Sequence, residues 1–255
     1  MINYVRRGQG PTLVLVHGFL GGSCLWRPAM AHFARFFDTI AVDLPGFGAS
    51  AASPAPGAPR DFSAAVFEQL DALGVERFHL VGSSIGGFIV QEMALAQPDR
   101  VERLVIYGSS AFIDTAARFE TVGESVARFR RDGLAATATR IAETWFVEGA
   151  DTPYFDLCRE ALTNVDVEKA AATLAACSDW DIRARLAEIA MPTLVIAGER
   201  DRSFSLEQFV GLRRGLPDAQ LAILPDCAHI AHLERPALFN QVVTEFLLAS
   251  PRRAE

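Results

Sequence analysis

Five consecutive residues, Gly82-Ser83-Ser84-Ile85-Gly86, have the spacing of a reactive serine held in a sharp turn. An apolar run typical of a strand, residues 78–81, precedes them, and residues 87–96 continue with apolar side chains at helical spacing. Glycine at both ends relieves the crowding of a turn that lifts one side chain above a sheet edge. The pattern predicts Ser84 as a nucleophile, although an ordinary glycine-rich turn has similar composition.

A serine nucleophile needs a base and an acid that orients it, and two later loops supply both. Asp201 follows the apolar run 193–197, and His229 follows the run 220–224. Since the carboxyl ends of parallel strands meet at one edge of a sheet, both side chains can reach Ser84 there. Their order along the chain, Ser, Asp, His, is the order of a catalytic triad built on such a sheet.

Each triad position has a neighbour of the same chemistry. Choosing Ser83 would place a glycine directly before the nucleophile, so we expect this serine to pack below the turn. Glu199 lies closer to its strand than Asp201 does and is expected to support the loop. His232 falls at the start of the closing helix, where we expect a helix-cap or core histidine.

Negative charge that develops on the substrate oxygen needs two backbone donors, each worth about 3–4 kcal/mol of barrier. The N–H of Ile85, directly after the nucleophile, is predicted as one donor. The N–H of Phe19, which follows His17-Gly18 in a loop after the first apolar run, is predicted as the other. A substrate pocket is predicted from bulky apolar side chains near this loop and in the middle of the chain: Phe19, Leu20, Phe129, Trp145 and Phe146.

Short β-rich runs alternate with helical patterns along most of the 255 residues, which predicts a mostly parallel central sheet flanked by helices. The alternation stops between residues 109 and 189, where amphipathic patterns follow one another. One of them sets Val126, Phe129, Leu134, Ala138, Ile141 and Trp145 roughly on one face. We therefore expect a core of residues 1–110 and 188–255, with a small all-helical cap, residues 111–187, inserted after the sixth strand.

Composition argues against several classes of function. The net charge of −7 and the absence of a Lys/Arg run predict no nucleic-acid partner, and no apolar stretch is long enough to cross a membrane. The first residues enter a strand-like segment rather than an apolar signal region, so a cytoplasmic location is expected. The four cysteines have no metal-site spacing. We predict no metal and no cofactor, and a monomer or homodimer.

The whole chain resembles the α/β-hydrolase superfamily. The resemblance is carried by His17-Gly18, by Asp-Leu-Pro-Gly-Phe-Gly at 43–48, by the serine turn at 82–87 and by Gly-Glu-Arg-Asp at 198–201. The ending His-Ile-Ala-His-Leu-Glu-Arg-Pro at 229–236 resembles the family pattern H-x-x-x-x-E-x-P, which implies that His229 is the catalytic histidine. The resemblance implies an α/β-hydrolase fold with a Ser84-His229-Asp201 triad.

The segments 125–134, 144–146 and 181–186 are similar to the helical cap of 3-oxoadipate enol-lactonases, and Pro-Gly-Phe-Gly at 45–48 resembles pimeloyl-ester esterases and meta-cleavage C–C hydrolases. We therefore expect a serine hydrolase that cleaves a small carboxylic ester or lactone through an acyl-enzyme intermediate. A C–C bond hydrolase is the alternative within the family. A ligand-sensing receptor that keeps a slow, vestigial triad is the alternative from another class.

Overall fold

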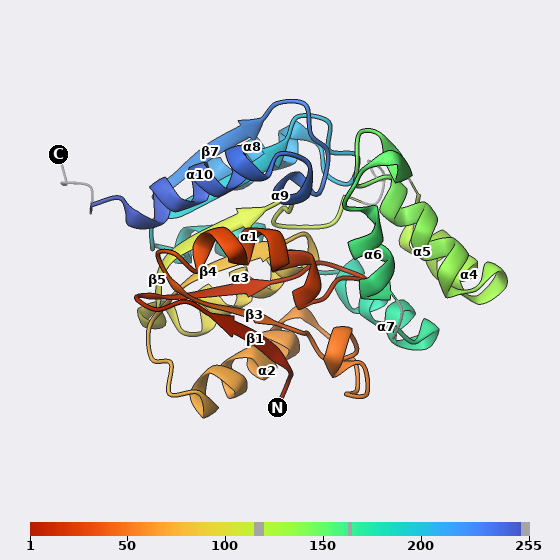
Figure 1. Cartoon of the computed structure of the whole chain (residues 1–255), viewed down its shortest axis with the longest axis horizontal. Coiled ribbons are helices and arrows are strands. Elements are labelled where there is room, and N and C mark those ends of the chain that lie inside the picture. Colours follow the sequence, from red (N-terminus) through yellow and green to blue (C-terminus); the bar gives the residue numbers. More distant parts are fainter. Residues whose placement is uncertain (115–119, 163–164, 251–255) are drawn as a thin grey trace.

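Figure 1 shows the computed structural model of the protein, which describes residues 1–114, 120–162 and 165–250. One seven-stranded sheet has the order β1-β3-β2-β4-β5-β6-β7, and every neighbouring pair is parallel except β1 and β3. The strands are β1 (Tyr4–Arg7), β2 (Thr12–Val16), β3 (Asp38–Val42), β4 (Phe78–Ser83), β5 (Val101–Tyr107), β6 (Thr193–Gly198) and β7 (Ala219–Leu224). The predicted α/β architecture with a mostly parallel sheet is confirmed.

Helices cover both faces of the sheet because its inner strands are apolar on both sides. Successive side chains of a strand point to opposite faces, so Leu13 and Leu15 join one hydrophobic cluster while Val14 and Val16 join the other. The first cluster is closed by α1 (Arg27–Phe33), α9 (Ala231–Glu234) and α10 (Pro236–Leu248). The second is closed by α2 (Pro59–Ala72), α3 (Ile85–Ala96) and α8 (Leu206–Gly215).

Four further helices lie together at one end of the molecule, at the right in Figure 1. They are α4 (Val122–Asp132), α5 (Leu134–Glu143), α6 (Phe155–Leu162) and α7 (Val167–Ser178), called here the helical insert. Short 3₁₀ turns complete the chain: η1 (Ser23–Trp26), η2 (Gly48–Ser50), η3 (Pro98–Arg100), η4 (Gly149–Asp151) and η5 (Arg183–Glu188). Two parts of the predicted cap, residues 115–119 and 163–164, lie outside the described residues.

The position and the helix boundaries of the insert differ from the expectation in two respects. Five strands, β1 to β5, precede the insert in the chain, so it follows the fifth strand and not a sixth. The apolar face predicted from Val126 to Trp145 is also not continuous. It is divided at Gly133, whose φ of 82° ends α4 and starts α5.

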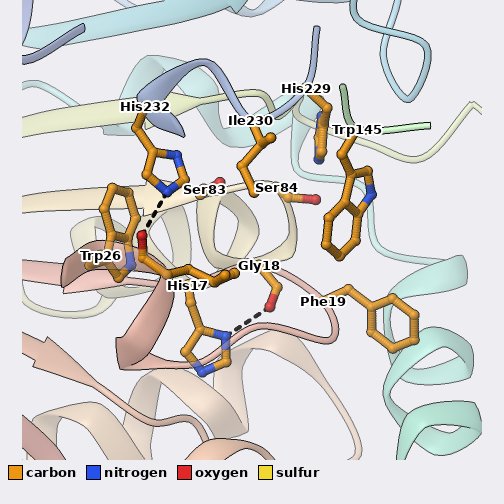
Figure 2. A pocket seen from close by; sticks show the side chains of 11 residues that line it. His17, Gly18, Phe19, Trp26, Ser83, Ser84, Trp145, His229, Ile230 and His232 are labelled. Carbon is orange, nitrogen blue, oxygen red and sulfur yellow. Dashed lines mark hydrogen bonds between the residues drawn. The ribbon is translucent and has the colours of Figure 1, made fainter. Parts of the chain in front are cut away.

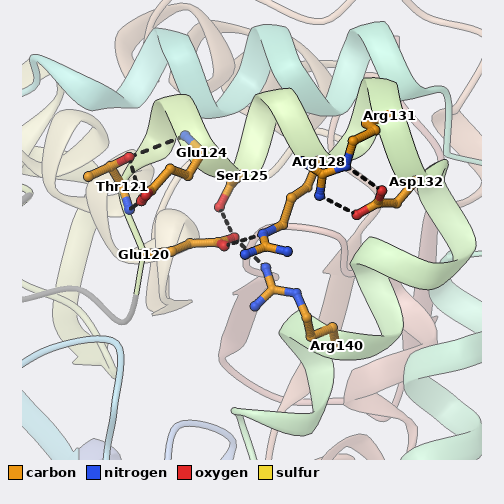
Figure 3. Close-up of polar contacts among 8 residues, drawn as sticks. All are labelled: Glu120, Thr121, Glu124, Ser125, Arg128, Arg131, Asp132 and Arg140. Carbon is orange, nitrogen blue, oxygen red and sulfur yellow. Dashed lines mark hydrogen bonds and ion pairs between the residues drawn. The ribbon is translucent and has the colours of Figure 1, made fainter.

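Polar contacts hold the start of the insert in place (Figure 3). Thr121 and Glu124 form a capping box at the N-terminus of α4, in which Glu124 N donates to Thr121 Oγ1 over 3.2 Å. The nearby carboxylate of Glu120 is buried and accepts hydrogen bonds from Ser125, Arg128 and Arg140. These contacts join α4 to α5 across the break at Gly133.

Within the described ranges, no helix combines the length and the apolar composition that crossing a membrane requires.

The crossing of β2 and α3 leaves no room for a side chain at Gly86, because an added Cβ would lie 2.5 Å from the carbonyl oxygens of both Val16 and His17. We predict that Gly86→Ala lowers the free energy of unfolding by at least about 1–3 kcal/mol, as overpacking does. Urea unfolding followed by circular dichroism measures the change.

The matched control is Gly211→Ala in α8, where an added Cβ meets nothing within 4 Å. Alanine should raise the free energy of unfolding there by up to about 1 kcal/mol, because it restricts the unfolded chain and favours the helix. Equal stabilities of the two variants would contradict the packing described for the serine turn.

Candidate active site

The backbone of Ser84 lies outside the ordinary regions for an L-residue, with φ of 56° and ψ of −122°. Hydrogen bonds hold it there: Ser84 N donates to Tyr107 O over 2.9 Å, and Ser84 O accepts from Ser109 Oγ over 2.7 Å and Gly87 N over 2.8 Å. A strained conformation persists only where surrounding contacts determine it, and such residues cluster at functional sites. The serine turn therefore has the conformation that the sequence predicts.

Asp201 and His229 form a buried pair at the carboxyl ends of β6 and β7. Asp201 Oδ2 lies 2.9 Å from His229 Nδ1, and the two side chains are 1% and 5% exposed. The other oxygen, Oδ1, accepts from the N–H groups of Ser203 over 2.7 Å and Phe204 over 3.3 Å. An ionised carboxylate only accepts hydrogen bonds, so Nδ1 is the donor, and Nε2 is the acceptor nitrogen of the neutral imidazole.

Figure 2 shows the imidazole of His229 beside the side chain of Ser84 at one cavity. Tyr107 Oη donates to His229 O over 2.8 Å, and the His229 ring stacks on Phe204 with the centroids 5.9 Å apart. No hydrogen bond joins Ser84 Oγ to His229 within the described residues. Catalytic hydrogen bonds are often long before substrate binds, and the two side chains share a cavity in which such a bond can form.

The neighbours of Asp201 and His229 have other contacts. Glu199 is exposed and accepts a hydrogen bond from Asp226 N over 3.1 Å, which supports the turn before His229. His232 is buried, lies within 3.2 Å of Leu25 O through Nε2, and stacks on Trp26 with the ring centroids 4.5 Å apart. Burial lowers the pKa of His232 to about 3, so its imidazole stays neutral and structural near neutral pH.

The loop after β2 is fixed by His17. Its Nδ1 lies 2.8 Å from Gly18 O, and its Nε2 accepts from Leu44 N over 3.0 Å, so Nδ1 carries the proton. Burial lowers the pKa of this imidazole, which favours the same neutral form. Phe19 follows in this loop and Ile85 starts α3, and both line a cavity with Ser84. The first N–H groups of a helix have no intrahelical acceptor, which leaves that of Ile85 available for a ligand.

Two small cavities, of about 20 and 40 Å³, meet at Ser84, and each has room for about one to three water molecules. Both are lined by Phe19, Ser84, Trp145 and His229. The first, called here the η1 cavity, is completed by His17, Gly18, Leu25, Trp26, Ser83, Ile230 and His232. The second, called here the insert cavity, is completed by Ile85, Phe88, Ile113, Ile141, Leu174, Ser203 and Phe204.

The residues predicted for the pocket separate into two groups. Phe19 and Trp145 line both cavities. The other three are buried without lining either one: Phe129 packs edge-on against Phe19 with the centroids 6.1 Å apart, Phe146 contacts Phe155, and Leu20 lies in the core with φ of 57°. Of these three, Phe129 supports a cavity wall through its contact with Phe19.

Most of the apolar lining was not predicted as such. Ile141 lies on the predicted amphipathic face of the insert, and Leu174 interrupts an alanine-rich helix, so their apolar character was visible in the sequence. Phe88 in α3 and Phe204 after Asp201 reach the cavity through the tertiary arrangement of α3 and the β6 loop. Ser83 lines the η1 cavity from the end of β4.

For a metal ion, the described part of the chain contains no group of three or more His, Cys, Asp and Glu side chains that could bind it. Among the described residues that line the two cavities at Ser84, histidine is the only type with an ionisable side chain. Ser84 and His229 line the same two cavities, and a hydroxyl beside an imidazole is suited to nucleophilic and acid–base chemistry.

A family model described as "Alpha/beta hydrolase family" matches residues 13–242. The chain belongs to this family. The match spans the serine turn, the loops that carry Asp201 and His229, and the helical insert.

The names of similar proteins cover several classes of substrate. A 2-hydroxy-6-oxononadienedioate/2-hydroxy-6-oxononatrienedioate hydrolase of Paraburkholderia phymatum is 34% identical, with 96% of this chain and 90% of the relative covered. A putative carbamate hydrolase, RutD, of Agrobacterium fabrum is 28% identical, with 94% of both chains covered. The crystal structure of the enol-lactonase from Burkholderia xenovorans LB400 has a TM-score of 0.90 at 25% identity and covers 97% of this chain and 96% of its own.

The neutral, buried state of His232 predicts a pH-dependent stability. In the unfolded chain an imidazole titrates near its ordinary value of about 6.5, whereas in the folded protein the pKa is about 3. Between these values the unfolded chain binds more protons, so the free energy of unfolding falls as pH falls, by at most about 1.4 kcal/mol per pH unit for this group.

His232→Gln removes this titration and keeps an amide donor for Leu25 O. We expect urea unfolding at pH 4, 5, 6 and 7 to show a shallower pH dependence in the variant than in the wild-type protein. Identical slopes would contradict the assignment of His232 as a buried neutral residue.

Proposed function

We propose that the protein hydrolyses small, uncharged carboxylic esters or lactones through an acyl-enzyme formed on Ser84. The observation that carries this proposal is the lining of the two cavities that meet at Ser84. Every described residue that lines them is apolar, Gly, Ser or His. A carboxylate on the substrate would be buried there without a described Lys or Arg partner, which is costly.

In the proposed reaction, His229 Nε2 takes the proton of Ser84 Oγ as this oxygen attacks the substrate carbonyl carbon. Asp201 keeps the imidazole in the tautomer that can accept this proton and stabilises the imidazolium that forms. The N–H groups of Phe19 and Ile85 stabilise the oxyanion. The imidazolium then protonates the leaving oxygen, and the ester bond breaks to leave the acyl group on Ser84.

Deacylation repeats these roles with water as the nucleophile. His229 removes a proton from the water, whose oxygen attacks the acyl carbon, and then returns the proton to Ser84 Oγ as the acid leaves. For a lactone the leaving oxygen stays attached to the acyl chain, so one hydroxy acid is released. No redox partner is needed for either substrate.

We also propose that residues 111–187 act as a cap on a core of residues 1–110 and 188–255. Trp145, Ile141 and Leu174 support this division, because these side chains of the middle segment line cavities that contain Ser84. Cavities of about 20 and 40 Å³ are too small for most acyl groups, so a substrate requires some displacement of the cap or of its side chains.

Cleavage of a C–C bond is the second candidate, since the relative from Paraburkholderia phymatum is named as a hydrolase of a dioate. A dioate carries two carboxylates, and the described cavity lining offers neither of them a cation. The lining therefore favours the ester or lactone, and a direct comparison of the substrates decides between them.

We predict that kcat/KM for an uncharged ester or lactone exceeds that for an analogue carrying a carboxylate on its acyl chain by at least about 100-fold, because the charge is buried unpaired. The assay uses the purified protein and compares kcat/KM for these two substrates with kcat/KM for a meta-cleavage dienoate. Preference for the dienoate would replace the proposed function with C–C hydrolysis, and release of product without further turnover would indicate a receptor.

Ser84→Ala tests the nucleophile in the same assay. Turnover should fall by about 10⁴- to 10⁶-fold, as for other serine triads, with the melting temperature unchanged. Ser83→Ala is the matched control, because Ser83 lines the η1 cavity next to the nucleophile, and it should keep most of the activity. The reverse pair of results would make Ser83 the nucleophile.

A further inference from the structure

We propose that Glu234 is a positioning residue that fixes the relative placement of His229 and Trp145. This inference rests on the function proposed above, in which His229 is the base and Trp145 a wall of the substrate cavity. Glu234 ends α9 and lies five residues after His229. Its side chain does not line either cavity at Ser84, so it acts through its neighbours.

The carboxylate of Glu234 accepts one backbone hydrogen bond on each oxygen. Oε2 accepts from Ala228 N over 2.6 Å, and Oε1 accepts from Val147 N over 2.7 Å. Ala228 directly precedes His229, whereas Val147 lies in the middle segment, two residues after Trp145. One carboxylate therefore joins the loop of the proposed base to the segment that carries the cavity wall. We call these two hydrogen bonds the Glu234 clamp.

A third hydrogen bond joins the same two segments directly, because Ile230 N donates to Trp145 O over 3.2 Å. Hydrogen bonds thus link the segments 228–230 and 145–147 on both sides of His229. The Trp145 and His229 rings lie 6.3 Å apart at an interplanar angle of 42°. The placement of these rings follows from the backbone that the clamp holds.

A carboxylate suits this role better than an amide of the same shape. Both oxygens of an ionised glutamate accept hydrogen bonds, and bonds to a charged acceptor are shorter and stronger than neutral ones. Glutamine would keep one acceptor and turn an NH₂ group toward the second backbone N–H, where two donors face each other. Glu234→Gln therefore breaks one arm of the clamp with almost no change in volume.

Two other polar contacts join the insert to the core without involving residues 145–147 or 228–230. Glu160 in α6 pairs with Arg27 in α1, with both side chains about half exposed. Lys169 in α7 donates to Ala51 O. Glu160→Gln is a matched control, because it makes the same chemical change in a carboxylate that joins the insert to the core without contacting the segments 145–147 or 228–230.

The experiment compares the wild-type protein, Glu234→Gln and Glu160→Gln. Hydrogen–deuterium exchange should become faster in Glu234→Gln for peptides spanning residues 145–148 and 226–230, and stay unchanged there in Glu160→Gln. On a series of uncharged esters with different acyl groups, kcat should fall between about 10- and 100-fold in Glu234→Gln, as for a small displacement of a catalytic group. The order of preference among acyl groups should change as well, because the Trp145 wall moves.

A stabilising role alone would predict something different. It would lower the melting temperature of Glu234→Gln and leave kcat and the acyl preference unchanged at temperatures where the variant is folded, and this result would overturn the proposal. An equal loss of kcat in Glu160→Gln would do the same. If Glu234→Gln does not fold, Glu234→Asp keeps the charge but is too short to reach both N–H groups, and the same readouts apply.

The exchange measurement separates this inference from the proposed function. If the wild-type protein hydrolyses none of the esters or lactones, the proposed function fails, and the clamp is still tested by exchange. Unchanged exchange of both peptides in the Glu234 variants would overturn the clamp, even if ester hydrolysis by the wild-type protein is established.

Discussion

The backbone of Ser84 is held in a conformation that it would not adopt alone, and much of the surrounding packing serves to hold it. A non-glycine residue in such a sparsely populated backbone region costs of order 1–3 kcal/mol, and it persists only where the surrounding structure determines it. At Ser84 the end of β4, the start of α3 and the carbonyl of Tyr107 provide that structure. The close approach of Gly86 to the carbonyls at the end of β2 adds a constraint that excludes any side chain. The hydroxyl is thereby presented above the sheet edge, where the loops after β2, β6 and β7 also meet.

The second constraint is the burial of charge and of hydrogen-bonding groups around that hydroxyl. The side chain of Asp201 is almost fully buried, and its two oxygens accept three hydrogen bonds. The histidines at the cavity have different partners: His17 fixes a loop, His232 stacks in the core, and His229 contacts Asp201 and lies beside Ser84 (Figure 2). Two apolar side chains of the insert, Ile141 and Leu174, line a cavity that contains Ser84.

Local sequence patterns predicted much of this structure. The serine turn was predicted because two glycines, an apolar strand and a helix surround it. The order of triad residues followed from strand ends, and the structure brings Asp201 and His229 within hydrogen-bonding distance. Their catalytic roles stay predictions.

Tertiary features were harder to predict. The break of the insert at Gly133 was missed because apolar spacing continues across it, and spacing does not reveal a positive φ. Phe88 and Phe204 reach the cavity through the packing of α3 and the β6 loop, which no local pattern records. The Glu234 clamp joins Val147 to Ala228, which are 81 residues apart in the chain. Its two hydrogen bonds depend on the tertiary fold that brings these segments together.

The central claim is that Ser84 is a nucleophile activated by His229. Its most direct test is covalent labelling with a fluorophosphonate, which reacts with activated serines, followed by intact mass and peptide mapping. We predict one label per chain, located on Ser84, in the wild-type protein and little or none in His229→Gln under the same conditions. A label on Ser83, or equal labelling with and without His229, would contradict the account.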